Sequence, residues 1–251
     1  MRKYKVAVLG ATGAVGQQMT KVLGERKFPI DALRLLASER SAGSIMDTPF
    51  GKIKVEEACD SAFKGMDIVL GAAENDIAKK AAPAIRAAGA VFVDNSSAFR
   101  MDPDVPLVVP EINPEDALKH HGLISNPNCS TIITMVAVNA INKLSPIKCM
   151  IASTYQAVSG AGAGGPIELD AQVNALLKGE PVSKNVFRYQ IAYNLIPEIG
   201  GANEEGYTSE EMKMQNEGRR IMHLPELAVT CTCVRVPVVR SHSISASIVT
   251  E

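Results

Sequence analysis

A glycine-rich turn between a short apolar run and a helical segment, close to the start of the chain, constrains the fold more than any other feature. Residues 5–9 are apolar and end at a glycine, as in a central strand of a parallel sheet. Glycines recur through 10–16, and residues 17–26 have helical spacing. In this order, strand, turn and helix suit a dinucleotide pyrophosphate, which the turn backbone and the helix N-terminus bind. The candidate cofactor contacts in the turn are Gly10, Thr12, Gly13, Ala14 and Val15.

The next predicted strand, 33–37, should end near the adenosine ribose of a bound dinucleotide. NAD sites usually place an acidic residue there, so Glu39 leaves NAD as a possible cofactor. Arg40, between Ser38 and Ser41, favours NADP because a guanidinium forms paired, charge-assisted bonds to a 2′-phosphate. The alternative is a solvated loop with no role in binding.

Strands and helices continue to alternate through the first half of the chain. The predicted elements are strands at 67–73, 90–94, 107–109 and 123–124, a helix at 76–88 and a short helix from 114. This alternation predicts a doubly wound α/β sheet. Arg100 follows the carboxyl end of one strand, where such sheets bind ligands, so it is a candidate clamp for a phosphate or carboxylate. A surface arginine is the alternative.

A polar, proline-containing segment at 125–128 leads into a single cysteine, Cys129. Residues 130–141 are apolar on nearly all sides and predict a buried helix. Cys129 should therefore lie at a helix N-terminus, where unpaired N–H groups and the helix dipole stabilise a thiolate. The alternative is an inert, buried cysteine.

The second half of the chain predicts a smaller α+β region. The expected elements are strands at 147–155, 228–237 and 244–249 and helices at 166–177 and 210–222. The glycine-rich stretch 159–165 should form no stable element, and residues 185–207 predict a long, irregular surface loop. Thr208 and Ser209 should cap the helix at 210–222.

Several polar side chains of the second half are ambiguous by themselves. Glu210 and Lys213 share a helix face, which also fits a solvated ion pair. Cys231 and Cys233 are too few for a zinc site and are interpreted as packing residues. A lone histidine such as His242 is more often structural than catalytic. It could share a site with Arg235 only if the intervening segment bends.

Composition excludes several functional classes. Lys plus Arg total 26 and Asp plus Glu total 27, for a net charge of −1, so no nucleic-acid partner is expected. No apolar run is long enough to span a membrane, and no signal peptide precedes the first strand. Five irregularly spaced cysteines predict a reducing, cytoplasmic location and no disulfide framework. No metal site is expected.

A series of motifs, in this order, resembles the bacterial, NADP-using aspartate-β-semialdehyde dehydrogenase family over essentially the whole chain. The motifs are Gly10–Gly16, Ala37–Gly43, Asp94–Arg100, Val109–Asn113, Asn126–Thr131, Tyr155–Gly160 and Arg235–His242. The resemblance implies an NADP-binding Rossmann domain at 1–127 and a catalytic and dimerisation domain at 128–251. It also implies a homodimer or homotetramer.

The resemblance implies reversible, NADPH-dependent reduction of L-aspartyl-4-phosphate to L-aspartate 4-semialdehyde, with release of phosphate, on the route to lysine, threonine and methionine. Cys129 would form a thioester. The remaining implied roles are proton transfer by His242, substrate orientation by Gln156, carboxylate binding by Arg235, phosphate binding by Arg100 and Lys213 with Glu210 nearby, and cofactor contacts from Ser159 and Gly160. Asn128 is a further candidate for binding substrate or phosphate.

Two rival functions remain at this stage. N-acetyl-γ-glutamyl-phosphate reductase shares the cysteine chemistry, and a non-catalytic NADP-binding sensor could share the fold. Members of the resembled family also continue beyond the strand at 244–249. The resemblance therefore implies that the catalytic domain is incomplete here, and that residues 1–251 alone lack full activity.

Overall fold

The structure is a computed structural model that describes residues 2–251. Contacts within the chain divide it into two compact units, Met1–Pro127 and Asn128–Glu251, called here the first and second unit. No helix among the described residues is long and apolar enough to cross a membrane.

The first unit is built on one large sheet. Its strands are β1 (Tyr4–Leu9), β2 (Ile30–Ala37), β3 (Ile45–Thr48), β4 (Gly51–Glu57), β5 (Ile68–Gly71), β6 (Val91–Asp94) and β7 (Leu123–Ser125). Their order is β3-β4-β2-β1-β5-β6-β7, and all neighbours pair in parallel except β3 with β4. The predicted doubly wound sheet is thereby confirmed, with an antiparallel strand added at one edge.

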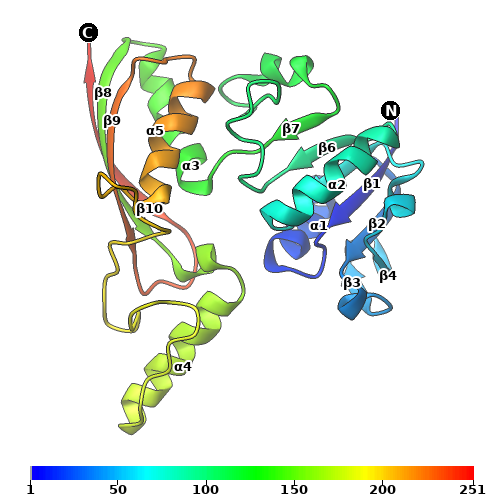
Figure 1. Ribbon diagram of the computed structural model, residues 1–251, viewed down its shortest axis with the longest axis horizontal. Helices are drawn as coiled ribbons and strands as arrows, with labels where there is room; N and C mark the ends of the chain where they lie inside the picture. Colours follow the sequence, from blue (N-terminus) through cyan, green and yellow to red (C-terminus); the bar gives the residue numbers. More distant parts are fainter. Residues whose placement is uncertain (1) are drawn as a thin grey trace. The chain divides into compact units, whose positions relative to one another are not determined.

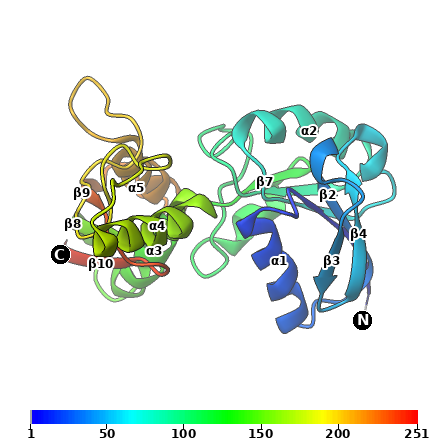
Figure 2. The same ribbon diagram turned by 90° about the horizontal axis from the view of Figure 1, so that it is seen from below.

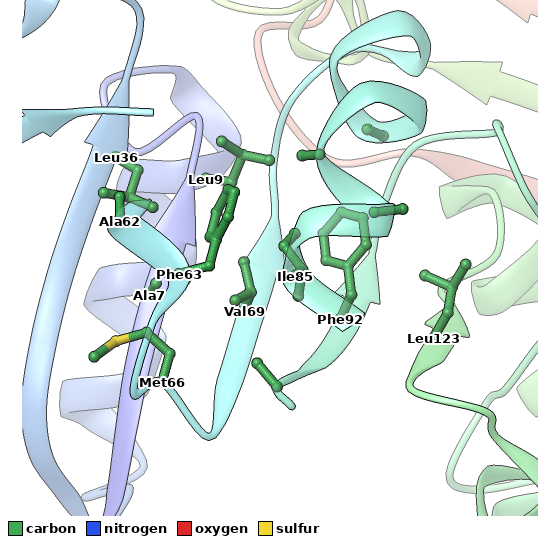
Figure 3. Packing of buried hydrophobic residues seen from close by; sticks show 14 of the residues in the cluster. Ala7, Leu9, Leu36, Ala62, Phe63, Met66, Val69, Ile85, Phe92 and Leu123 are labelled. Carbon is green, nitrogen blue, oxygen red and sulfur yellow. The ribbon is translucent and has the colours of Figure 1, made fainter. Parts of the chain in front are cut away.

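Helices cover both faces of this sheet. α1 (Ala14–Glu25) lies on one face and α2 (Asn75–Ala87) on the other (Figure 2). Successive side chains of β1 point to opposite faces, so Leu9 joins the cluster under α2 while Val8 joins a second cluster on the other face. In the cluster under α2, Phe63 and Val69 lie near Ile85 of the helix (Figure 3). The glycine turn is thus attached to a well-buried strand.

One local expectation for the first unit was wrong, and one strand pair was not predicted. Residues 107–109 form no strand; Leu107 makes only an isolated bridge to Ser125, because Pro106 and Pro110 flank the run and lack the N–H groups that a ladder needs. The β3–β4 pair was not predicted, since both strands are largely exposed and lack a continuous apolar run.

The second unit combines a small sheet with three helices. Its elements are α3 (Cys129–Asn142), β8 (Ile147–Gln156), α4 (Gly164–Lys178), α5 (Ser209–Ile221), β9 (Ala228–Arg235) and β10 (Ser243–Thr250). β8 is central, parallel to β9 and antiparallel to β10. α3 and α5 pack against each other and on this sheet, α3 on β8 and α5 on β9 (Figure 1).

Short 3-10 helices link these elements at η1 (Glu39–Ser41), η2 (Asp60–Phe63), η3 (Pro114–Lys119) and η4 (Val158–Ala161). The last of these corrects the expectation that 159–165 forms no stable element. η4 occupies its start and α4 begins at Gly164. A Cβ on Gly165 would lie 2.0 Å from the carbonyl oxygen of Val158, so glycine lets the start of α4 lie directly on η4.

Candidate active site

Three strand ends meet at one end of the small sheet in the second unit. β8 ends at Gln156, which pairs with Arg235 at the end of β9. β10 runs the other way and begins at Ser243, which pairs with Tyr155. His242 directly precedes that start. The topology therefore brings together Gln156, Arg235 and His242 from distant parts of the sequence.

The segment between Arg235 and His242 bends, as a shared site requires. It is held to the end of β8 by backbone hydrogen bonds from Val158 to Val238 and from Ser159 to Val239. A Cβ placed on Gly160 would lie 2.6 Å from Arg235 Nη1 and 3.3 Å from His242 Nε2. Both side chains thus converge on the same glycine, and a larger residue there would push them apart.

Cys129 is the first residue of α3, and it is exposed. The preceding residue, Asn128, is the helix N-cap: its Oδ1 accepts the Thr131 N–H at 3.2 Å. N–H groups in the first turn have no carbonyl partner within a helix, so this end carries a partial positive charge. The thiol therefore lies where a thiolate is stabilised and a reagent can reach it.

Glu210 connects the residues around the cysteine. Its Oε1 accepts hydrogen bonds from Asn128 Nδ2 at 2.8 Å and Gln156 Nε2 at 3.0 Å, and its Oε2 pairs with Lys213 Nζ at 3.0 Å. Burial opposes ionisation of Glu210, but the Lys213 ammonium and the amide hydrogen bonds outweigh it and hold the pKa below its ordinary value. Glu210 is therefore a buried anion and not part of a solvated surface pair.

Arg235 and His242 lie in a partly desolvated environment. Burial lowers the pKa of Arg235, and the negative charges of Glu210 and of the Cys129 thiolate oppose that shift. Burial and then the neighbouring Arg235 charge lower the pKa of His242 from its usual 6.5, against a smaller opposing effect of Glu210. His242 is therefore neutral at pH 7.

The hydrogen bonding of His242 also sets its tautomer. Its Nδ1 accepts the Ala157 N–H at 3.0 Å. A neutral imidazole has one N–H, so the ring hydrogen lies on Nε2, the nitrogen next to Gly160. In this state Nε2 can donate a hydrogen bond but cannot accept one.

Cys231 and Cys233 lie on the same buried face of β9, with their sulfurs 3.6 Å apart. Their mutual contact and burial raise the pKa of Cys231 well above that of an ordinary thiol. No group of three or more His, Cys, Asp or Glu residues within 2–251 is arranged to hold a metal ion. These cysteines pack as buried core residues.

In the first unit, the glycine turn has the geometry that a dinucleotide needs. Gly10 has φ +82°, a conformation that other residues rarely adopt, and a Cβ on Gly16 would lie 2.3 Å from the Gly10 carbonyl oxygen. At Gly13, by contrast, a Cβ would have only an ordinary contact at 3.4 Å, so folding does not demand glycine there. A hydrogen at Gly13 instead leaves the start of α1 open to a phosphate, which fits a dinucleotide.

The other predicted cofactor and phosphate residues of the first unit lie in segments that follow the carboxyl ends of strands. Ser38 directly follows β2, and Arg40 and Ser41 lie in η1 with the Arg40 side chain exposed. Arg100 is buried and donates to the Asn95 carbonyl oxygen at 2.8 Å, near Asp94. Burial raises the pKa of Asp94, and the hydrogen bonds from Ser96 and the Arg100 charge oppose this.

Sequence reasoning missed two residues of the second-unit site. Thr154 donates to Gln156 Oε1 at 2.9 Å and so fixes which way that amide points. Glu217 is almost completely buried, and its Oε2 accepts the Asn128 N–H at 2.6 Å. A signal was present for Glu217: it lies seven residues after Glu210 and therefore on the same helix face.

Comparison with known proteins places this fold in a class. The family model described as "Semialdehyde dehydrogenase, NAD binding domain" matches residues 5–120, and "Semialdehyde dehydrogenase, dimerisation domain" matches residues 138–251. Together these define a two-domain semialdehyde dehydrogenase, a class of oxidoreductase.

Individual relatives narrow the class. Aspartate-semialdehyde dehydrogenase from Aquifex aeolicus is 50% identical over 99% of this chain and 74% of its own length, and the Synechocystis enzyme is 48% identical over 95% and 71%. The crystal structure of aspartate semialdehyde dehydrogenase II from Vibrio cholerae complexed with ASA superposes with a TM-score of 0.98 at 43% identity, covering 100% of this chain and 75% of that one. The chain belongs to the aspartate-semialdehyde dehydrogenase family.

Proposed function

We propose that this chain catalyses the reversible, NADP-dependent interconversion of L-aspartyl-4-phosphate and L-aspartate 4-semialdehyde, with Cys129 as the nucleophile. The observation that carries this proposal is an exposed cysteine at the capped N-terminus of α3. The hydrogen-bond donors Arg235 and His242 converge on Gly160 in the same unit. Relatives named as aspartate-semialdehyde dehydrogenases support this reading over N-acetyl-γ-glutamyl-phosphate reductase and over a non-catalytic sensor.

The proposed role of Cys129 is covalent catalysis. Its thiolate attacks the acyl carbon of the aspartyl phosphate, a C–S bond forms, and the C–O bond to phosphate breaks as phosphate leaves with the bonding electrons and takes up a proton. The resulting thioester divides one difficult transfer into two easier steps. The backbone N–H groups of the first turn of α3 are suited to stabilise the charge that develops on the acyl oxygen.

His242 is proposed to stabilise the same acyl oxygen of the substrate. In the neutral tautomer its Nε2–H donates a hydrogen bond, which stabilises negative charge on the oxygen when the thioester is reduced. Collapse of that reduced adduct breaks the C–S bond and returns the thiolate and the aldehyde, with no net proton transfer. Proton shuttling by His242, expected from the sequence, stays a prediction, and hydrogen-bond donation is the role that its tautomer supports.

Polar side chains of the second unit would orient the substrate. Arg235 presents a guanidinium, suited to paired hydrogen bonds with the substrate carboxylate. Gln156 is fixed by Thr154 and Glu210 and would hold the acyl group beside Cys129. Lys213, partly exposed beside Glu210, is suited to bind phosphate. The phosphate role of Arg100 stays a prediction from the resemblance.

The glycine turn and the Ser38–Ser41 segment are the proposed NADP site. Gly10, Thr12, Gly13, Ala14 and Val15 would hold the pyrophosphate at the start of α1, and Arg40 the 2′-phosphate with Ser38 and Ser41. When bound, NADPH supplies a hydride. Ser159 and Gly160 stay predicted cofactor contacts.

A homodimer or homotetramer is proposed for the assembly, supported by the match of residues 138–251 to a dimerisation domain. Sedimentation velocity at assay concentration tests it, and a monomer with full turnover would contradict it. A cytoplasmic location is also proposed. Support comes from the five free thiols, Cys59, Cys129, Cys149, Cys231 and Cys233, which form no disulfide among residues 2–251.

The function is tested by phosphate-dependent reduction of NADP with L-aspartate 4-semialdehyde and, in parallel, with N-acetyl-glutamate semialdehyde. We expect turnover with the first substrate and a loss of at least about 10⁴-fold in kcat for Cys129→Ala, as when other nucleophiles are removed. Cys149→Ala, a half-buried thiol in β8, is the control and should retain activity. Turnover that survives Cys129→Ala would refute the thioester route.

The cofactor assignment has its own test. Arg40→Ala should reduce the preference for NADP over NAD by about tenfold, because one charge-assisted phosphate contact is lost. The matched control is Lys64→Ala, an exposed cation before β5, at the opposite end of the sheet strands from η1. An unchanged preference in Arg40→Ala would remove Arg40 from that role.

A further inference from the structure

Asn128, the residue before the nucleophile, is held at each of its polar groups. Its side-chain oxygen accepts from Thr131, its side-chain nitrogen donates to Glu210, and its carbonyl oxygen accepts the Ile132 N–H. Its backbone N–H donates to Glu217 at 2.6 Å. Since Pro127 has no N–H, this is the last backbone donor before that of Cys129 itself.

The two carboxylates that hold Asn128 come from one face of one helix. Glu210 and Glu217 are two turns apart on α5, with Met214 between them, and all three are buried. Next to Glu217, a Cβ on Gly218 would lie 2.3 Å from Met135 Cε of α3, so glycine lets α5 approach α3 closely. This close approach lets the Glu217 side chain reach the start of α3.

We propose that Glu217 is a positioning residue for Cys129. Glu210 fixes the side chain of Asn128 and Glu217 fixes its backbone, so the peptide that leads into the nucleophile is held from two sides. A thiol that attacks a bound acyl group must be held to within a fraction of an ångström, and misplacement by about 1 Å can cost about 10²-fold in rate. Glu217 would act through Asn128 and would not touch the substrate.

For this role, residue 217 must place an acceptor oxygen within hydrogen-bond distance of the Asn128 N–H. Glu217→Gln keeps an oxygen at the same distance and should still accept the Asn128 N–H. Glu217→Asp keeps the carboxylate but withdraws it by one methylene, which breaks a 2.6 Å contact. The proposal therefore predicts that the amide variant outperforms the shorter acid, the reverse of what a purely electrostatic role predicts.

The test measures kcat and KM per active site, with active sites counted by the burst of NADPH formed in the first turnover. Glu217→Asp should lower kcat at least about tenfold with KM within about threefold, because binding groups are untouched and positioning is lost. Glu217→Gln should keep kcat within about threefold. Met214→Ala, buried on the same face without a hydrogen bond to Asn128, is the control for destabilisation and should leave kcat per active site unchanged.

The proposal would be overturned if Glu217→Asp and Glu217→Gln lowered kcat equally. It would also be overturned if Met214→Ala lowered kcat per active site as much as Glu217→Asp does. If Glu217→Asp leaves no countable sites, the Gln variant decides, and a loss in kcat of more than about tenfold there contradicts it. The inference rests on the proposed thioester function, and Cys129→Ala separates the two failures. Activity in Cys129→Ala refutes the function. If Cys129 is essential but the Glu217 variants keep the parent kcat, only the positioning role is refuted.

Discussion

The two units build their candidate sites from different materials. In the first unit the site is mostly backbone: a left-handed Gly10, a glycine at 16 that admits a carbonyl oxygen, and the start of α1. In the second unit it is almost entirely side chains, which meet around Glu210 and Gly160 from strand ends and two helices. A backbone site depends on a few consecutive residues, whereas a side-chain site depends on the packing of the whole unit.

The largest effect is expected at the centre of the side-chain site. Glu210→Ala leaves the amides of Asn128 and Gln156 buried without their acceptor, so the free energy of unfolding should fall by about 3 kcal/mol. Urea denaturation measures this. Glu205→Ala, on an exposed loop, is the control and should change stability by less than about 0.5 kcal/mol. Equal stability of the two variants would mean that Glu210 does not hold the site together.

The next effect separates packing from cofactor binding in the backbone site. Gly16→Ala puts a methyl group 2.3 Å from backbone and should lower the free energy of unfolding by about 2 kcal/mol. Gly13→Ala has room and should fold normally, but its methyl group should weaken NADPH binding. Urea denaturation and NADPH fluorescence titration measure the two effects. A Gly16→Ala protein as stable as the parent would contradict this division of roles.

A single methyl group can also test the side-chain site. Gly160→Ala should displace the ends of Arg235 and His242, which are flexible enough to move, and so raise the KM for semialdehyde by about tenfold with little change in stability. Gly201→Ala, where a Cβ meets nothing within 4 Å, should leave KM unchanged. A KM for Gly160→Ala equal to that of Gly201→Ala would show that the two side chains do not converge on Gly160 in solution.

The smallest expected effect concerns the charge state of His242. Its pKa lies below 6.5 because of burial and the Arg235 charge, so the neutral ring persists to lower pH than in a free histidine. The same shift favours the folded state above pH 6.5, a contribution that is lost as pH falls through the lower folded pKa. Titration of the imidazole by NMR should give a midpoint below 6.5, with the hydrogen on Nε2. Arg235→Gln should move the midpoint upward, and a parent midpoint above 6.5 would contradict the account.

The same contrast explains what could be predicted from sequence. The glycine turn at 10–16 and the cysteine after Asn126-Pro127 were recognisable because a few adjacent residues define each feature. The central strands were recognisable because both faces are buried and the runs are continuously apolar. β3 and β4 escaped detection because most of their residues are exposed, so neither strand has a continuous apolar run.

The network around Glu210 could not be predicted from residue patterns alone. Spacing alone favours a solvated ion pair for Glu210 and Lys213, because the pattern does not report burial. Their role depends on the packing of α5 against α3, which Gly218 permits. No local sequence motif predicts that packing. The resemblance to a known family supplied these residues, but it supplied neither Glu217 nor the tautomer of His242.

The central claim is that Cys129 carries the acyl group. Rapid acid quench of the protein with L-aspartate 4-semialdehyde and NADP, without phosphate, followed by intact mass and peptide mapping, tests it most directly. The account predicts a gain of one aspartyl group on the peptide that contains Cys129, and no gain in Cys129→Ala. Formation of NADPH with no such adduct in the parent protein, or with the adduct on another residue, would contradict it.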